Sequence, residues 1–199
     1  HNKLVNLAKG KYFMWLHSDD KISKNFIYEA VNILENKKDI IGVVGKILLI
    51  NSENKKIVKK YIEPKHLEEN YYNRTVKFIK NYNDFLINSL FRTEKIPKFY
   101  DCISCETIFI LEILRRGRIF GNKKLIYYKN STLVKRTTKN LIKHYNPKKK
   151  KSFKGVWFFK RILVFIKSEE TALNKLKLIF ILLLYFAPIT RIFFKINKN

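Results

Sequence analysis

Apolar runs alternate with polar, turn-forming segments along the chain, and this order predicts alternating strands and helices. Residues 12–16 form a short apolar run, which is typical of a strand buried on both faces in a parallel sheet. After polar residues 17–20, apolar positions recur at helical spacing over residues 24–35. Residues 39–50 and 56–62 are rich in β-branched residues and flank a turn-like segment, so we expect a hairpin there.

The second half of the pattern continues this alternation. Residues 66–91 have the apolar spacing of one or two helices. A helix that begins near Glu106 and ends near Arg116 is apolar nearly all round, which argues that it is buried. Residues 118–120 and 125–128 follow as two short strands around a Gly-Asn turn. We therefore expect an α/β fold.

A polar, acidic segment, His17-Ser18-Asp19-Asp20, ends the first apolar strand. Open α/β sheets bind their ligands at the carboxyl ends of strands. Adjacent carboxylates at that place suit a divalent ion that also holds a phosphate. Alternatively, the two aspartates are only turn residues before a helix, where their side chains satisfy free backbone N–H groups.

Three segments together resemble inverting glycosyltransferases of family 2, which have the GT-A fold. They are Asn2, the run Ala8-Lys9-Gly10-Lys11-Tyr12 and the acidic segment. Those enzymes carry Arg-Asn, then Ala-x-Gly-x-Tyr, an apolar strand and an Asp-x-Asp-Asp signature. The resemblance implies a Rossmann-like, mixed and mostly parallel sheet flanked by helices, incomplete at the amino terminus. It also implies that Asp19, assisted by Asp20, binds the Mg²⁺ or Mn²⁺ that holds the nucleotide-sugar diphosphate. His17 stands at the first aspartate of the signature and is a further substrate-binding candidate.

Two later segments extend the resemblance. Residues 88–92, Asn-Ser-Leu-Phe-Arg, resemble a Gly-Leu-Phe-Arg motif, which implies that Arg92 lies near the diphosphate or acceptor; the alternative is a surface arginine. Glu106 lies eleven positions before Gly117, at the place of the family's general base, which takes the proton of the acceptor hydroxyl. Asp101 is the second candidate for that base. The alternative for Glu106 is an acid that only stabilises a helix amino terminus.

The composition adds a strong positive charge, with 42 basic against 16 acidic residues and a net charge of +26. Such a surplus predicts affinity for nucleic acid or for an anionic membrane surface. Residues 146–199 hold 13 basic and 2 acidic residues beside apolar segments and Trp157, a combination that suits a helix lying in the membrane interface. The alternative is a helical pair packed on the catalytic domain.

The two cysteines and the lack of nucleic-acid-binding signatures argue against several functional classes. Cys102 and Cys105 give no disulfide framework, and zinc would need two more ligands. The sequence has no zinc-finger, helix-turn-helix or RNA-recognition signature, so we expect no nucleic-acid partner.

We therefore predict two parts: residues 1–140, the later part of a GT-A catalytic domain, and residues 141–199, a basic amphipathic helical tail. The enzyme would move a sugar from a nucleoside-diphosphate sugar to a glycan or lipid-linked acceptor in surface polysaccharide synthesis. It would be cytoplasmic and peripheral on the inner face of the cell membrane. The competing functions are a basic nucleic-acid-binding module and an inactive transferase fragment.

Overall fold

The structure is a computed structural model that describes residues 2–51, 54, 56–61, 70–80, 84–99, 105–131, 172–173, 175–177 and 179. Its helices are α1 (Asn2–Leu7), α2 (Phe26–Asn36), α3 (Tyr71–Lys80) and α4 (Cys105–Arg116), with short 3-10 helices η1 (Asp84–Asn88) and η2 (Thr93–Lys95). Its strands are β1 (Tyr12–Met14), β2 (Lys21–Ile22), β3 (Ile40–Asn51), β4 (Ile57–Tyr61), β5 (Leu90–Arg92) and β6 (Arg118–Ser131).

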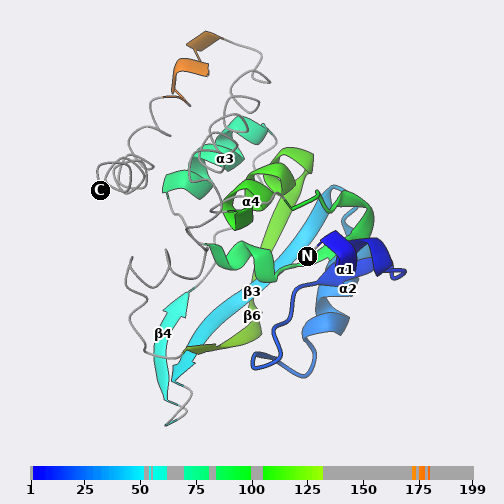
Figure 1. The fold of residues 1–199 in the computed structure, drawn as a ribbon, viewed down its shortest axis with the longest axis vertical. Coiled ribbons are helices and arrows are strands. Elements are labelled where there is room, and N and C mark those ends of the chain that lie inside the picture. Colours follow the sequence, from blue (N-terminus) through cyan, green and yellow to red (C-terminus); the bar gives the residue numbers. More distant parts are fainter. Residues whose placement is uncertain are drawn as a thin grey trace, which may run out of the picture.

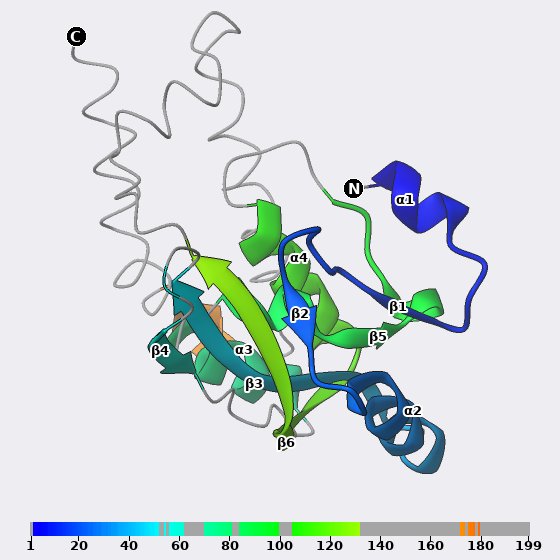
Figure 2. The same ribbon diagram turned by 90° about the horizontal axis from the view of Figure 1, so that it is seen from below.

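Within these residues the six strands form one sheet with helices on both faces (Figure 1). The order is β1-β5-β3-β6-β2, and β4 pairs with β3 outside this path. On one face, α4 packs against the sheet with α3 next to it, and a core there includes Val44, Phe91 and Phe109. On the other face, α2 covers a second core that includes Phe26 and Val43 (Figure 2). Neighbouring residues of β3 thus face opposite layers, as the alternation of side chains along a strand requires.

The expected α/β class is confirmed, and the sheet is mixed, but it is not mostly parallel. Of the five pairings between described strands, only β3–β6 is parallel, and it runs from Ile40↔Arg118 to Asn51↔Ser131. The predicted β3–β4 hairpin is present. The strand predicted for residues 12–16 is shorter and only half-buried, and among the described strands it pairs with β5 alone, in antiparallel orientation. It is therefore not the parallel strand buried on both faces that the apolar run suggested.

The Gly-Asn segment is not a turn between two strands. Residues 118–131 form the single strand β6, and its pairing with β3 shifts register where Gly45↔Asn122 is followed by Lys46↔Ile126. The extra residues form a bulge, in which the Asn122 side chain accepts a hydrogen bond from the Lys124 N–H at 3.0 Å. A bulge and a turn share the same local signal of glycine and asparagine, which is why the sequence indicated a turn.

The helices at residues 24–35 and 106–116 are confirmed as α2 and α4. In the segment 66–91, α3 and η1 are helical as expected, but Leu90 and Phe91 belong to β5. Most of the segment 141–199 lies outside the described residues, so the predicted domain boundary and the helical tail stay predictions. No helix in the described part of the chain is long and apolar enough to cross a membrane.

Arg92 has a structural place that corrects the expectation of a substrate contact. Its side chain is buried, and its guanidinium donates hydrogen bonds to the carbonyl oxygens of Leu34, of Lys37 at 3.4 Å and of Ile40 at 3.0 Å. A cation at the carboxyl end of α2 satisfies carbonyl groups that the helix leaves unpaired. Arg92 also pairs with Tyr12, at the end of β1 opposite to the acidic segment.

We predict that Arg92→Met lowers the free energy of unfolding by about 2 kcal/mol or more, because buried carbonyl groups lose their donor. Arg115→Met, at an exposed position of α4, is the matched control and should stay within about 0.5 kcal/mol of the parent. Urea unfolding followed by circular dichroism measures both. Equal effects of the two substitutions would contradict the capping role of Arg92.

Candidate active site

The acidic segment after β1 folds into a turn whose last residue is buried. The Asp20 N–H donates to the His17 carbonyl oxygen at 3.1 Å, which closes the turn. The Asp20 carboxylate is only 1% exposed. It accepts hydrogen bonds from the Tyr127 hydroxyl at 2.7 Å, from the Asn130 N–H at 2.9 Å and from Lys129 Nζ at 3.4 Å. These three donors all come from β6, so the turn is tied to that strand.

A buried amide extends this network toward β1. The Asn88 side chain, 1% exposed, donates to the Tyr127 hydroxyl at 3.0 Å and to the Trp15 carbonyl oxygen at 3.3 Å. Burial and the hydrogen bond to Asp20 raise the pKa of Tyr127 above its ordinary value. Tyr127 therefore stays protonated and remains a donor to Asp20. We call Asn88, Tyr127, Asn130 and Asp20 the Asp20 network.

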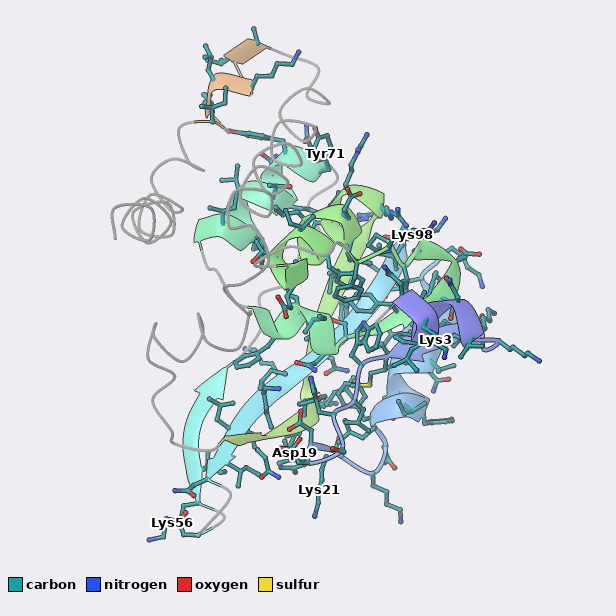
Figure 3. All side chains as sticks on the ribbon, viewed as in Figure 1. Lys3, Asp19, Lys21, Lys56, Tyr71 and Lys98 are labelled. Carbon is teal, nitrogen blue, oxygen red and sulfur yellow. The ribbon has the colours of Figure 1, made fainter. Side chains whose placement is uncertain are left out.

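Asp19 has a different environment, although it is the adjacent residue. Its backbone is held, because the Asn130 side-chain amide donates to the Asp19 carbonyl oxygen. Its carboxylate is exposed, and among the described residues we find no donor to it. Asp19 and Lys21, two positions apart in sequence, are labelled near each other in the lower part of Figure 3. One aspartate therefore fixes the turn, and the other presents a free carboxylate from a fixed backbone.

His17 and Lys129 border the same turn. His17 Nδ1 lies 3.3 Å from Asp20 Oδ2, and the imidazole is 56% exposed. Lys129 Nζ lies 3.4 Å from the same oxygen, and its side chain is 26% exposed. Lys129 therefore brings a positive charge beside the buried Asp20 carboxylate and next to the surface that Asp19 occupies.

The described side chains include no cluster of three or more histidine, cysteine or acidic residues that could hold a metal ion by themselves. Mg²⁺ does not need such a cluster, since it usually keeps waters and uses one or two carboxylates together with substrate phosphates. The exposed Asp19 carboxylate fits this mode of binding. Asp20 stays a predicted ligand, but its oxygens already accept hydrogen bonds from β6.

Glu106 lies in the first turn of α4 and is half-buried. One helical turn later, the Phe109 ring stacks on Phe99 with centroids 4.2 Å apart. The Phe99 ring also meets Trp15 edge-on at 5.4 Å. Because Trp15 follows β1 directly, this aromatic row connects α4, one turn after Glu106, with the strand end that carries the acidic turn. Asp101, the second candidate for the base, lies outside the described residues.

A family model described as glycosyl transferase family 2 matches residues 1–103 of the chain. The chain belongs to this family. No curated protein matches the chain significantly. Among the solved structures that match is the crystal structure of S. aureus TarS 1-349, with 15% identity and a TM-score of 0.42. The match covers 65% of this chain and 38% of the TarS chain.

The family 2 match confirms the resemblance drawn from the motifs, and it includes the acidic turn and β1. It ends before Glu106, so the role of this glutamate stays a prediction. Of the candidate residues, the structure brings His17, Asp19 and Asp20 together and places Arg92 elsewhere. Tyr127 and Asn88 both lie in segments that resemble family motifs, but the sequence predicted neither contact, because a tyrosine in an apolar strand and an asparagine before a strand carry no local signal of such hydrogen bonds.

We predict that Tyr127→Phe lowers the free energy of unfolding by about 1–3 kcal/mol, because Asp20 and Asn88 each lose a buried hydrogen-bond partner. The neighbouring Tyr128 is half-buried, and Tyr128→Phe should leave stability within about 0.5 kcal/mol. Chemical unfolding of both variants tests this difference. If Tyr127→Phe is as stable as the parent protein, the Asp20 network does not hold the turn.

Proposed function

We propose that this family 2 protein transfers a sugar from a nucleoside-diphosphate sugar to a glycan or lipid-linked acceptor in surface polysaccharide synthesis, with a divalent metal and with inversion. The observation that carries the proposal is the exposed Asp19 carboxylate on a turn that the buried Asp20 fixes, within the part of the chain that matches the family. Because its backbone is already fixed, Asp19 needs less reorganisation to bind a metal–diphosphate group, which favours binding.

In this proposal Asp19 holds Mg²⁺ or Mn²⁺ together with the diphosphate of the donor. When bound, the metal would neutralise charge on the leaving diphosphate. His17 borders the same surface with an exposed imidazole and would contact the donor. Lys129 beside Asp20 would add a further positive charge near the phosphates.

Glu106 is the proposed general base. The oxygen of the acceptor hydroxyl would form a bond to the anomeric carbon, while the bond from that carbon to the diphosphate oxygen breaks on the opposite face. The hydroxyl proton would pass to the Glu106 carboxylate. Support for this role comes from the place of Glu106 in the first turn of α4, which the Phe109–Phe99–Trp15 contacts join to the end of β1.

The place of action is proposed from the sequence alone. Residues 146–199 carry 13 basic and 2 acidic residues beside apolar segments. We expect them to bind the anionic inner face of the cell membrane, where a lipid-linked acceptor would be reached.

The first test is calorimetric titration of Mn²⁺ with UDP into the full-length protein. We predict that Asp19→Asn weakens metal-dependent UDP binding by at least about tenfold, because the variant lacks the free carboxylate. Asp39→Asn is the matched control, since Asp39 is also exposed but pairs with Arg118 at 2.7 Å beside the start of β3. Binding that does not depend on the metal, or that survives in Asp19→Asn, would contradict the proposed metal site.

The second test concerns the base. Glu106→Gln should lower kcat by about a hundredfold or more and leave the affinity for Mn²⁺–UDP unchanged, because the amide cannot take the proton. The assay measures UDP release with acceptor present. Glu29→Gln, at an exposed position of α2, is the control and should be fully active. Normal turnover of Glu106→Gln would remove this residue from the mechanism.

A further inference from the structure

The side chain of Asn2 makes a two-point contact with the backbone of a distant residue. Asn2 Nδ2 donates to the Phe99 carbonyl oxygen at 2.8 Å, and Asn2 Oδ1 accepts from the Phe99 N–H at 2.7 Å. The amide thus satisfies both backbone groups of Phe99, as a neighbouring strand would. A contact of this kind fixes the position and also the orientation of the Phe99 backbone, which a single hydrogen bond does not.

The ring of Phe99 connects the two parts of the proposed active site. It stacks on Phe109 with an interplanar angle of 15°, and it meets Trp15 at 87°. Phe99 is 7% exposed, Phe109 is fully buried, and both belong to the core under α4. Aromatic pairs such as these favour particular ring geometries and add stability beyond their buried area.

Each neighbour of Phe99 lies a short step from a proposed functional carboxylate. Phe109 follows Glu106 by three positions, so the two residues lie on the same side of α4. Trp15 precedes the turn of Asp19, and its carbonyl oxygen accepts from Asn88 of the Asp20 network. A shift of the Phe99 backbone would therefore change the position of the base relative to the metal-binding turn.

Few contacts other than those of Asn2 hold α1 against the rest of the described chain. The six-residue helix α1 has no buried residue, and Leu4 and Leu7 are 57% and 64% exposed. Only Val5 packs partly against the core. The specific contact that α1 makes with the rest of the described chain is the pair of hydrogen bonds to Phe99.

We propose that Asn2 is a positioning residue, which sets the separation between the Glu106 base and the Asp19 turn by holding Phe99. This inference rests on the proposed function. It requires that loss of the contact impairs the chemical step and spares metal–nucleotide binding, which depends on the Asp19 turn and the Asp20 network. Misplacement of reacting groups by about 1 Å can lower the rate by about a hundredfold.

The experiment compares Asn2→Ala with Lys3→Ala in the full-length protein. Lys3 is the exposed neighbour on α1, labelled with Lys98 in Figure 3, and serves as the matched control. We expect Asn2→Ala to lower kcat by about tenfold or more, while KM for the donor and the Kd for Mn²⁺–UDP change by less than about twofold. Lys3→Ala should match the parent in all three quantities.

A second variant tests the route through Phe99. Phe99→Leu keeps the backbone partners of Asn2 but removes the stacking, so it should also lower kcat with little change in Kd. Because both changes act through one contact, the effect of the double variant on kcat should be smaller than the product of the single effects. Independent effects would overturn the route.

Several outcomes overturn the positioning role. An unchanged kcat in Asn2→Ala would do so, and so would a parallel loss of kcat and of Mn²⁺–UDP affinity, which indicates general loosening of the fold. Failure of the proposed function has a different signature: the parent protein itself would neither bind Mn²⁺–UDP nor release UDP with acceptor present, and the inference would fall with it.

Discussion

The proposed site depends on the hydrogen bonds that β6 donates to the buried carboxylate of Asp20. Burying a charged group is unfavourable unless it is paired and hydrogen-bonded. Here donors from Tyr127, Lys129 and Asn130 meet this requirement, and all three lie on β6, more than 100 positions later in the chain. Since β6 pairs with β3 on both sides of its bulge, the acidic turn is joined through Asp20 to the centre of the sheet.

The two adjacent aspartates have different environments, and we propose that their roles differ as well. The environment of Asp20 suits a carboxylate that fixes the turn, because its oxygens accept hydrogen bonds from β6. The environment of Asp19 suits a ligand, since its backbone is fixed and its side chain is exposed. A metal–diphosphate group would then meet a carboxylate on a fixed backbone, so less backbone freedom is lost on binding. On the side of the proposed base, the hydrogen bonds of Asn2 hold the Phe99 backbone in a similar way.

Much of the fold follows from local sequence. The helices α2 and α4 and the β3–β4 hairpin were predictable because their apolar spacing is regular and their ends carry turn residues. The family 2 motifs located the acidic turn. The bulge in β6, the short strand β5 and the antiparallel pairing of β1 were not predictable, because strand pairing depends on residues far apart in sequence.

The candidate site shows the same limit. Asp19 and Asp20 could be found from their place after an apolar run, but their different burial could not. That difference arises from Tyr127 and Asn130, and an interior arginine such as Arg92 is indistinguishable from a surface one until its carbonyl partners are placed. Short motifs identify candidate residues, whereas the burial and contacts of each candidate depend on the strands that pack against it.

The most direct measurement is the anomalous diffraction signal of Mn²⁺ in crystals of the full-length protein grown with UDP. The account predicts manganese within bonding distance of an Asp19 carboxylate oxygen and of the diphosphate, with Asp20 still hydrogen-bonded to Tyr127. Manganese bound to Asp20 with the Tyr127 contact broken, or manganese away from the acidic turn, would contradict the separation of roles between the two aspartates.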